Sequence, residues 1–445
     1  MGKHNIEKYS LFYSVLKAIA GFWHNRVYYR RVITVGGENL DRTRHNILVS
    51  NHQNALMDPL AILFTSKGQP IFLARASIFK SKFIAKILYS LKMLPVFRPR
   101  DGWDTVKKND DIFEKTIDVI RNKNGLALMP EGNHAGFRRL RQLQKGVCRI
   151  AFMAEEAENF GLDIQIVPVA VEYSNYFKFR QTVTVEYGEP FGFTELHDLY
   201  REKPQLAINE LKDKIAERLR DLIIHIETKE DYEAVDELRE LVNGIHFADK
   251  VHPKVTRDKE LIAKLEEAEN ERPGLYREIC NKALKIKNIA ASLNIGYYHL
   301  NRKNPGLLVH MISILSLVAL APLALYGFIT NLVFYRVPNM ALRNIKDPQF
   351  LSTIRFGVSL AMALLFIPLY AVLAFVFINK WWLALLVFLS ILPAGLLAWN
   401  YFIIWKKLRE GIRVRKYANR NNPEYKILRT LYADLMKDIE ILNRG

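Results

Sequence analysis

The longest apolar runs of this chain lie in its last third. Residues 307–335, 356–378 and 381–405 contain no Asp, Glu, Lys or Arg. A helix that crosses a bilayer needs about 20 apolar residues, so each run is long enough for one span. Trp381 and Trp405 sit at the ends of the third run, where amphipathic rings favour the membrane interface. Three successive runs of this kind, within residues 306–405, predict a multi-pass membrane protein rather than buried helices of a soluble core.

The polar flanks of these runs constrain the topology. All of them are basic, namely residues 282–303, 336–355 and 406–420. Three simple spans would place successive flanks on opposite sides of the membrane, against the positive-inside tendency. Pro322 divides the first run, and Asn379 and Lys380 form a minimal turn between the second and third. We therefore predict a re-entrant or interfacial segment followed by a hairpin of two spanning helices, with both chain ends in the cytosol.

The first 31 residues combine an apolar helical stripe with a basic end. The stripe consists of Leu11, Phe12, Val15, Leu16, Ile19, Phe22 and Trp23, and the basic end of His24, Arg26, Arg30 and Arg31. This spacing predicts an amphipathic helix between Tyr9 and Arg31. Such a helix suits the membrane interface, and an ordinary helix packed on a domain fits the pattern equally well.

Between these ends, short β-branched runs alternate with helical patterns. Buried strands are expected at residues 46–49, 70–73, 125–129, 164–171 and 182–187. This alternation predicts an α/β domain over residues 32–193. Residues 194–305 are charged and lack a strand pattern, with helical runs at 210–226 and 259–270, so they are expected to form a helical connector. Residues 406–445 are expected to be a basic cytosolic tail.

Charge and cysteine content narrow the classes of partner and compartment. The chain has 64 Lys and Arg against 46 Asp and Glu, a formal net charge of +18. Phosphate-bearing substrates, acidic lipid headgroups and nucleic acids all suit this charge. Cys148 and Cys280 lie far apart and outside any C-x-x-C spacing, so neither a disulfide framework nor a zinc site is indicated. A domain facing the reducing cytosol is expected, without a cleaved secretion signal.

One segment carries the residues that acid–base chemistry needs. Residues 50–59 follow the strand expected to end at Val49, and strand ends are where α/β proteins bind ligands. Acyl transfer to an alcohol needs a base for the hydroxyl proton, and the pKa of histidine suits this task. A nearby carboxylate would fix the histidine tautomer and stabilise the imidazolium. His52 and Asp58 are the candidates for these two roles.

Four blocks in this order resemble those of the glycerolipid acyltransferase family. They are Asn51-His52 with Asp58, Pro95-Val96-Phe97-Arg98, Met129-Pro130-Glu131-Gly132 and Ile166-Val167-Pro168-Val169, and together they cover roughly residues 45 to 190. The resemblance implies a mixed sheet with surrounding helices. It also implies transfer of a fatty acyl group to a hydroxyl of glycerol 3-phosphate or of its monoacyl product.

Two positions depart from the family's usual pattern. Five residues rather than four separate His52 from Asp58, so the turn must accommodate one more residue. Asn133 and His134 stand where the third block normally continues with Thr-Arg. Both departures resemble the fungal-type enzymes that acylate glycerol 3-phosphate or dihydroxyacetone phosphate. An unacylated glycerol phosphate is therefore the expected acceptor, ahead of 1-acylglycerol 3-phosphate and of another lysolipid or amino-lipid.

The blocks and the basic residues near them suggest a set of substrate-binding candidates. They are Arg98, Arg100, Glu131, Gly132, His134, Arg138, Arg139 and Pro168. Arginine can grip a phosphate through two donors, and Glu131 would orient substrate hydroxyls or fix a phosphate-binding arginine. The cluster of Arg138, Arg139, Arg141 and Lys145 could replace the missing third-block arginine, contact acidic lipids or form a solvated face. His134 either contacts phosphate or is a structural histidine.

The donor and the cofactors follow from the reaction class. A thioester is already activated, so the acceptor hydroxyl can attack it directly with no acyl-enzyme, cofactor or metal. Acyl-CoA and acyl carrier protein are both expected donors, and an anionic bilayer is the expected surface. A transporter would carry ionisable residues inside its spans, and these runs have only His310 near one edge. The remaining alternative is a non-enzymatic basic scaffold that binds nucleic acid or a membrane. It explains the charge but not the four blocks, and no nucleic-acid partner is expected.

Overall fold

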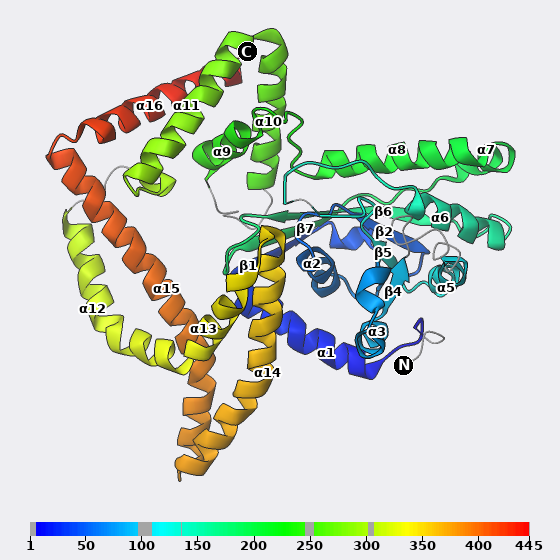
Figure 1. The fold of residues 1–445 in the computed structure, drawn as a ribbon, viewed down its shortest axis with the longest axis horizontal. Helices are drawn as coiled ribbons and strands as arrows, with labels where there is room; N and C mark the ends of the chain where they lie inside the picture. The colour runs from blue at the N-terminus through cyan, green and yellow to red at the C-terminus, as the bar shows by residue number, and fades with distance from the viewer. Residues whose placement is uncertain (1–5, 97–108, 135, 245–252, 301–306, 445) are drawn as a thin grey trace. The chain divides into compact units, whose positions relative to one another are not determined.

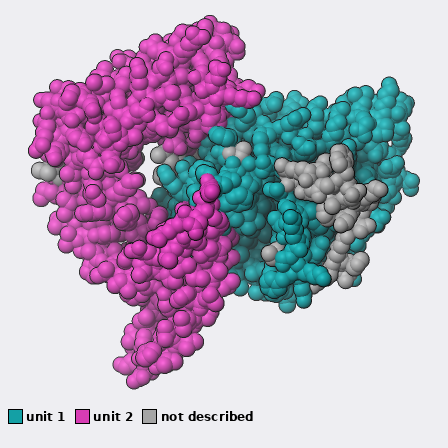
Figure 2. Space-filling view, viewed as in Figure 1, with its two compact units in different colours: residues 1–225, 347–353 teal, residues 226–346, 354–445 magenta. Residues whose placement is uncertain are grey.

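The chain forms two compact units, coloured separately in Figure 2. A computed structural model describes residues 6–96, 109–134, 136–244, 253–300 and 307–444. The first unit comprises Met1–His225 together with Asp347–Thr353, and the second comprises Ile226–Lys346 and Ile354–Gly445. The first unit therefore includes a short segment from the last third of the chain, which lies more than a hundred residues beyond the rest of it.

A mixed β-sheet forms the centre of the first unit (Figure 1). In the described part of the chain it has seven strands in the order β1-β7-β6-β2-β5-β3-β4. These are β1 (Arg31–Val35), β2 (Asn46–Ser50), β3 (Ile71–Arg75), β4 (Met93–Val96), β5 (Leu126–Leu128), β6 (Gln165–Tyr173) and β7 (Thr182–Tyr187). The β6–β7 pair is antiparallel, and the other pairs are parallel. The α/β class with a mixed sheet is confirmed.

Strand residues alternate between two covered faces of this sheet. Ile47 and Val49 of β2 belong to one hydrophobic cluster, while Leu48 between them points to the opposite face and is equally buried. Side chains on successive strand residues point to opposite faces. A strand that is buried on both faces therefore reads as a continuous apolar run, and this is the pattern by which the central strands were predicted.

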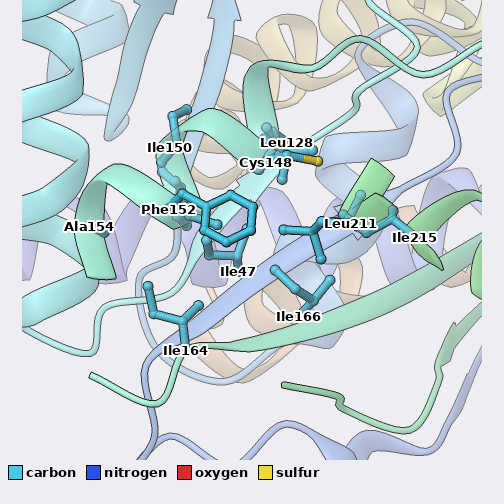
Figure 3. Packing of buried hydrophobic residues seen from close by; sticks show 14 of the residues in the cluster. Ile47, Leu128, Cys148, Ile150, Phe152, Ala154, Ile164, Ile166, Leu211 and Ile215 are labelled. Carbon is cyan, nitrogen blue, oxygen red and sulfur yellow. The ribbon is translucent and has the colours of Figure 1, made fainter. Parts of the chain in front are cut away.

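Helices cover both faces of the sheet. One face packs against α5 (Asn109–Arg121), α6 (Gly146–Ala157) and α8 (Pro204–Leu222), and α2 (Met57–Thr65) contacts β6 and β7. Figure 1 shows α8 and α2 on opposite sides of the strands. Figure 3 shows the cluster on the α8 side, where Phe152 of α6 lies among isoleucine and leucine side chains from β2, β6 and α8. Burial of these side chains is the main force that closes the unit.

Two strands and one boundary differ from the prediction. The five predicted strands are present, with ends shifted by at most two residues, but β1 and β4 were not predicted. Among the described strands β1 pairs only with β7, at the edge of the sheet, and it begins at Arg31, where the predicted N-terminal helix was expected to end. The compact unit also extends to His225 rather than ending at 193. The reason is that Leu211, Ile215 and Leu219 of α8 belong to its hydrophobic cluster.

The N-terminal helix is shorter than predicted. Helix α1 (Leu11–Phe22) continues into a π-helical turn, η2 (Trp23–Tyr28), and Arg31 begins β1 instead of extending the helix. His24 is buried rather than part of an exposed basic end, and burial lowers the pKa of its imidazole to about 4.

Helix α1 packs on the unit with one side and exposes the other. Tyr13 is buried, and the Lys17 ammonium donates to the carbonyls of Ser66 and Gly68 at 2.9 and 2.8 Å. The opposite side exposes an apolar row of Leu11, Phe12, Val15, Ile19 and Phe22, each at least 45% exposed. The packed side matches the interpretation of a helix packed on a domain, and the membrane-interface interpretation stays a prediction for the uncovered apolar row.

The second unit is helical in its described residues. It contains α9 (Tyr232–Asn243), α10 (Pro253–Glu271), α11 (Pro273–Ser292), α12 (Leu307–Thr330), α13 (Leu332–Ala341), most of α14 (Leu351–Phe377), α15 (Trp381–Asn419) and α16 (Pro423–Arg444). Leu308–Thr330, Pro348–Phe377 and Trp381–Asn419 are long and apolar enough to cross a membrane. The predicted tail 406–445 is instead the end of α15 followed by α16, which packs on α11.

The first apolar run is broken at Asn331 rather than at Pro322. Helix α12 continues through Pro322 to Thr330, and α13 begins at Leu332. Gly327 makes the contact with α15 possible, since a Cβ there would lie 2.0 Å from the Ala394 carbonyl oxygen. The buried Asn331 amide donates to the Ile391 carbonyl at 2.8 Å, which satisfies a polar group at the break.

Candidate active site

Three neighbouring parallel strands end at the same edge of the sheet. β5 and β6 flank β2 and run parallel to it, so their carboxyl ends point the same way. His52 follows β2, Glu131 and His134 follow β5, and Tyr173 is the last residue of β6. The sheet thereby gathers residues from blocks that lie far apart in the sequence, at the place where open α/β sheets bind ligands.

His52 and Asp58 form a hydrogen-bonded pair. The His52 Nδ1 atom lies 2.9 Å from Oδ2 of Asp58. A carboxylate oxygen can only accept, so the shared proton belongs to Nδ1. Nε2 then carries the lone pair, and no described residue forms a hydrogen bond with it. This is the tautomer that a histidine base requires.

The Asp58 carboxylate is buried and fully engaged. Besides His52, its Oδ2 accepts from the backbone N–H groups of Gln53 and Asn54 at 2.7 Å each, and its Oδ1 accepts from the Tyr173 hydroxyl at 2.8 Å. Asp58 lies in the first turn of α2, where the helix dipole favours a negative charge. Ala55, which lies between His52 and Asp58, has a left-handed φ of 41°. The longer spacing thus still lets the two side chains meet.

Glu131 holds the backbone of His52. Its Oε1 accepts from the His52 N–H at 2.7 Å, and its Oε2 accepts from Arg141 Nε at 3.0 Å. Burial raises the pKa of the Glu131 carboxyl, and these donors partly oppose the shift. Of the two predicted roles for Glu131, fixing an arginine matches these contacts. Nη2 of Arg141 is buried and has no hydrogen-bond partner among the described residues. The N–H groups of this atom are therefore not used by another described residue.

His134 lies beside His52 and bonds to a residue far along the chain. The two imidazole rings meet edge-on, with centroids 5.3 Å apart. Nδ1 of His134 is hydrogen-bonded to the Gln349 side-chain oxygen, and the Phe350 ring lies 5.0 Å from the imidazole centroid. Burial lowers the pKa of His134, with the Gln349 hydrogen bond acting in the opposite direction.

The other predicted substrate-binding residues lie in different surroundings. Gly132 occupies a left-handed turn with φ of 67°, a conformation that favours glycine. Pro168 is buried within β6, opposite Val49 of β2, which favours a role in the sheet over contact with substrate. Arg98 and Arg100 lie outside the described residues.

Arg138 and Arg139 are held within the unit. The Arg138 side chain is 2% exposed, pairs with Glu172 at 2.7 Å and donates to the Tyr173 carbonyl at 2.7 Å. This arrangement favours a structural role for Arg138 over the predicted binding of phosphate. The Arg139 carbonyl accepts from the Gln53 amide at 3.0 Å, which ties its loop to the turn between His52 and Asp58.

Several residues of this site were not predicted. Tyr173, Gln349 and Phe350 were missed, and Arg141 was considered only as part of a basic cluster. A hydroxyl at the end of a strand that neighbours β2 is a signal that could have identified Tyr173. No local pattern marks Gln349, because its 215-residue separation from His134 is bridged only by the tertiary structure.

Three comparisons with known proteins each match a part of the chain. The family model described as Acyltransferase matches residues 31–172. The chain is 24% identical over 153 residues to 1-acyl-sn-glycerol-3-phosphate acyltransferase of Borreliella burgdorferi, a match that covers 34% of this chain and 56% of that relative. The chain thus spans little more than half the length of this curated relative. The crystal structure of the 1-acyl-sn-glycerophosphate acyltransferase PlsC from Thermotoga maritima matches at 21% identity and a TM-score of 0.30, over 44% of this chain and 80% of that one.

Replacement of Arg138 by methionine should destabilise the protein. Removal of one partner of a buried ion pair deprives the Glu172 carboxylate of the Arg138 charge, at a cost of about 3–5 kcal/mol. We expect a clear drop in the thermal unfolding midpoint in detergent. The same substitution at the exposed Arg149 of α6 is the control and should leave the midpoint within about 1 °C of the unmodified protein, since exposed positions contribute little. An unchanged midpoint for Arg138→Met would contradict the structural role and favour substrate binding by Arg138.

Proposed function

We propose that this chain, whose residues 31–172 form a domain of the glycerolipid acyltransferase family, moves an acyl group from an acyl thioester to a hydroxyl of a glycerol phosphate. The observation that carries the proposal is the His52–Asp58 pair at the carboxyl end of β2. Its Nδ1 is held by a buried carboxylate, and its Nε2 is available as a base.

The reaction needs one proton transfer in each direction. His52 Nε2 takes the proton from the acceptor hydroxyl as its oxygen attacks the thioester carbonyl carbon. The tetrahedral oxyanion then collapses, the carbon–sulfur bond breaks, and the imidazolium returns the proton to the thiolate. Asp58 stabilises the imidazolium between these steps, and the products are an ester and a free thiol. The hydroxyl attacks directly, so no acyl-enzyme forms.

Arg141 is the phosphate ligand that the described residues support best. It is pinned by Glu131, which also holds the backbone of His52, so a phosphate on Arg141 would lie at a fixed position relative to the base. Its Nη2 has no hydrogen-bond partner among the described residues, and an arginine with free donors suits a phosphate. Arg98 of the second block and Arg100, two residues beyond it, remain proposed phosphate ligands.

The acceptor is proposed to be glycerol 3-phosphate or dihydroxyacetone phosphate. Support comes from the longer His52 to Asp58 spacing and from His134 in the third block, the two features shared with fungal-type enzymes. The second candidate is 1-acylglycerol 3-phosphate, which the name of the Borreliella burgdorferi relative favours. The donor is proposed to be acyl-CoA or acyl carrier protein.

Membrane attachment is proposed to involve the N-terminal helix as well as the apolar helices of the second unit. The exposed row on α1 includes Phe12 at 64% exposure, and uncovered apolar side chains of this size favour a membrane interface. We propose that the catalytic unit faces the cytosol and lies against the bilayer through this row.

Replacement of Asp58 by asparagine should abolish most of the activity. The amide cannot hold the Nδ1–H tautomer of His52, and the corresponding change in a serine protease triad costs about four orders of magnitude in kcat. We expect kcat for glycerol 3-phosphate acylation with palmitoyl-CoA to fall by about 10²- to 10⁴-fold. The same substitution at the exposed Asp198 should leave kcat unchanged. Activity of Asp58→Asn within about twofold of the unmodified protein would refute the proposed base.

Replacement of Arg141 by methionine should weaken acceptor binding more than turnover. A charge-assisted hydrogen bond to phosphate contributes to binding in the ground state, so KM for the acceptor should rise about 10- to 100-fold while kcat falls less. Steady-state kinetics across acceptor concentrations measure both constants. A fall in kcat with unchanged KM would instead assign Arg141 to the support of Glu131.

Contact of α1 with lipid can be measured in the reconstituted full chain. A fluorophore attached at Phe12→Cys should be quenched by brominated lipids, because its side chain would lie in the interface. A fluorophore at Glu210→Cys of α8 should not be quenched, and in intact cells this cysteine should react with an impermeant thiol reagent only after permeabilisation. Equal quenching at both positions, or labelling from outside, would contradict the proposed orientation.

A further inference from the structure

A short segment before the second apolar run belongs to the first unit, which contains the candidate active site. We name Asp347–Thr353 the return segment. The buried Ser352 donates its hydroxyl to the Tyr176 carbonyl, and its own carbonyl accepts from the Tyr28 hydroxyl at 3.1 Å. Thr353 Oγ1 accepts from the N–H of Leu56 at 3.2 Å, within the turn between His52 and Asp58. The return segment is thus hydrogen-bonded to the first unit at Tyr28, Leu56 and Tyr176.

The return segment determines the protonation pattern of His134. An amide oxygen has no proton to give, so in the bond between His134 Nδ1 and Gln349 Oε1 the histidine donates. Gln349 is itself held in place, because its backbone N–H donates to Asp347 Oδ1 at 3.0 Å. Phe350 meets the His134 ring edge-on at 89°.

The free nitrogen of His134 is therefore a hydrogen-bond acceptor. Burial lowers the pKa of His134, so the ring is neutral around pH 7 and Nε2 carries a lone pair. No described residue forms a hydrogen bond with this atom. His52 has the same arrangement, with Nδ1 engaged and Nε2 open. The two imidazoles, with centroids 5.3 Å apart, thus each leave one ring nitrogen without a hydrogen bond to a described residue.

We propose that Gln349 and Phe350 hold His134 beside His52 so that its Nε2 accepts a hydrogen bond from a second free hydroxyl of the acyl acceptor. The site would then select a phosphate that carries two neighbouring hydroxyls, with glycerol 3-phosphate as the simplest example. This inference rests on the proposed acyl transfer. His134 and His52 would contact substrate, and Gln349 and Phe350 would be positioning residues.

Hydrogen-bond chemistry separates the three candidate acceptors. Glycerol 3-phosphate offers one hydroxyl to His52 and another to His134. Dihydroxyacetone phosphate has a ketone in place of the second hydroxyl, and a ketone oxygen cannot donate to a lone pair. In 1-acylglycerol 3-phosphate the second hydroxyl is already esterified. A lone pair also repels an anionic phosphate oxygen, so the tautomer fixed by Gln349 favours a hydroxyl over phosphate as the partner of His134.

The test compares acceptors in matched variants of the purified full chain. The variants are Gln349→Leu, His134→Leu and, as a control with the same change at an exposed position of α8, Gln205→Leu. Each is assayed with palmitoyl-CoA and with glycerol 3-phosphate, dihydroxyacetone phosphate or 1-acylglycerol 3-phosphate. Thermal unfolding in detergent verifies that each variant is folded.

The expected result is a selective loss. The unmodified protein and Gln205→Leu should prefer glycerol 3-phosphate by kcat/KM. In Gln349→Leu and His134→Leu, KM for glycerol 3-phosphate should rise about tenfold, the effect of one lost hydrogen bond to substrate, while KM for dihydroxyacetone phosphate stays the same. The preference between these two acceptors should therefore nearly disappear.

The Gln349→Glu variant provides a readout that a purely structural role would not change. Glutamate still accepts from Nδ1, so activity at about pH 8 should be retained. The new carboxylate adds to the charged and titratable groups near His134, which are His52, Asp58 and Asp347. It raises the pKa of His134, and protonation of Nε2 removes the acceptor. As the pH is lowered, KM for glycerol 3-phosphate should rise in both proteins, and in Gln349→Glu the rise should begin at a higher pH than in the unmodified protein.

The outcomes distinguish this inference from the proposed function. No product from any acceptor would refute acyl transfer itself. Acyl transfer with equal loss on all acceptors in Gln349→Leu, or with 1-acylglycerol 3-phosphate as the best acceptor, would overturn the inference and leave the His52–Asp58 proposal standing. An unchanged pH profile in Gln349→Glu would likewise overturn the role of Gln349.

Discussion

The buried carboxylate of Asp58 is the group on which the rest of the site depends. A charge away from water is stable only where donors surround it, and Asp58 receives four: the imidazole of His52, two backbone N–H groups of the following turn and the hydroxyl of Tyr173. These bonds fold the turn after β2 back onto the start of α2 and orient the His52 ring. One anion thus fixes the backbone, the tautomer and the direction of the open nitrogen together.

The sheet topology supplies the partners of this anion. β5 and β6 lie beside β2 and run parallel to it, so Glu131 and Tyr173 lie at the same edge of the sheet as His52. Glu131 holds the backbone N–H of His52 and the guanidinium of Arg141, and Tyr173 closes the other side of Asp58. The buried pair of Arg138 and Glu172 ties the loop after β5 to β6. Buried polar groups that follow or belong to three neighbouring strands therefore satisfy one another through hydrogen bonds and an ion pair.

The return segment adds a contribution from a distant part of the chain. Asp347–Thr353 precedes the apolar length of α14 in sequence, yet its contacts belong to the unit that contains the sheet. Through Gln349 it fixes one proton on His134, and through Thr353 it accepts from the turn that carries Asp58. A family match that ends at residue 172 gives no information on this segment. Specificity in this protein is therefore proposed to depend on residues outside the matched domain.

The sequence by itself determined the α/β class, the five central strands, the three apolar helices and the pairing candidates His52 and Asp58. Each of these depends on local information: continuous apolar runs, their length, or residues six positions apart in one turn. It did not determine β1, which begins at the end of the predicted N-terminal helix, or β4, which has only four residues and contains Pro95, nor that α8 completes the core of the first unit. The structure also decided how each arginine is held. Arg138 and Arg141 look alike in sequence, and each pairs with a buried carboxylate, but Arg138 also donates to the Tyr173 carbonyl, whereas Nη2 of Arg141 has no hydrogen-bond partner among the described residues. Gln349 belongs to the site solely because the folded chain returns there, and no periodicity or motif can encode a contact across 215 residues.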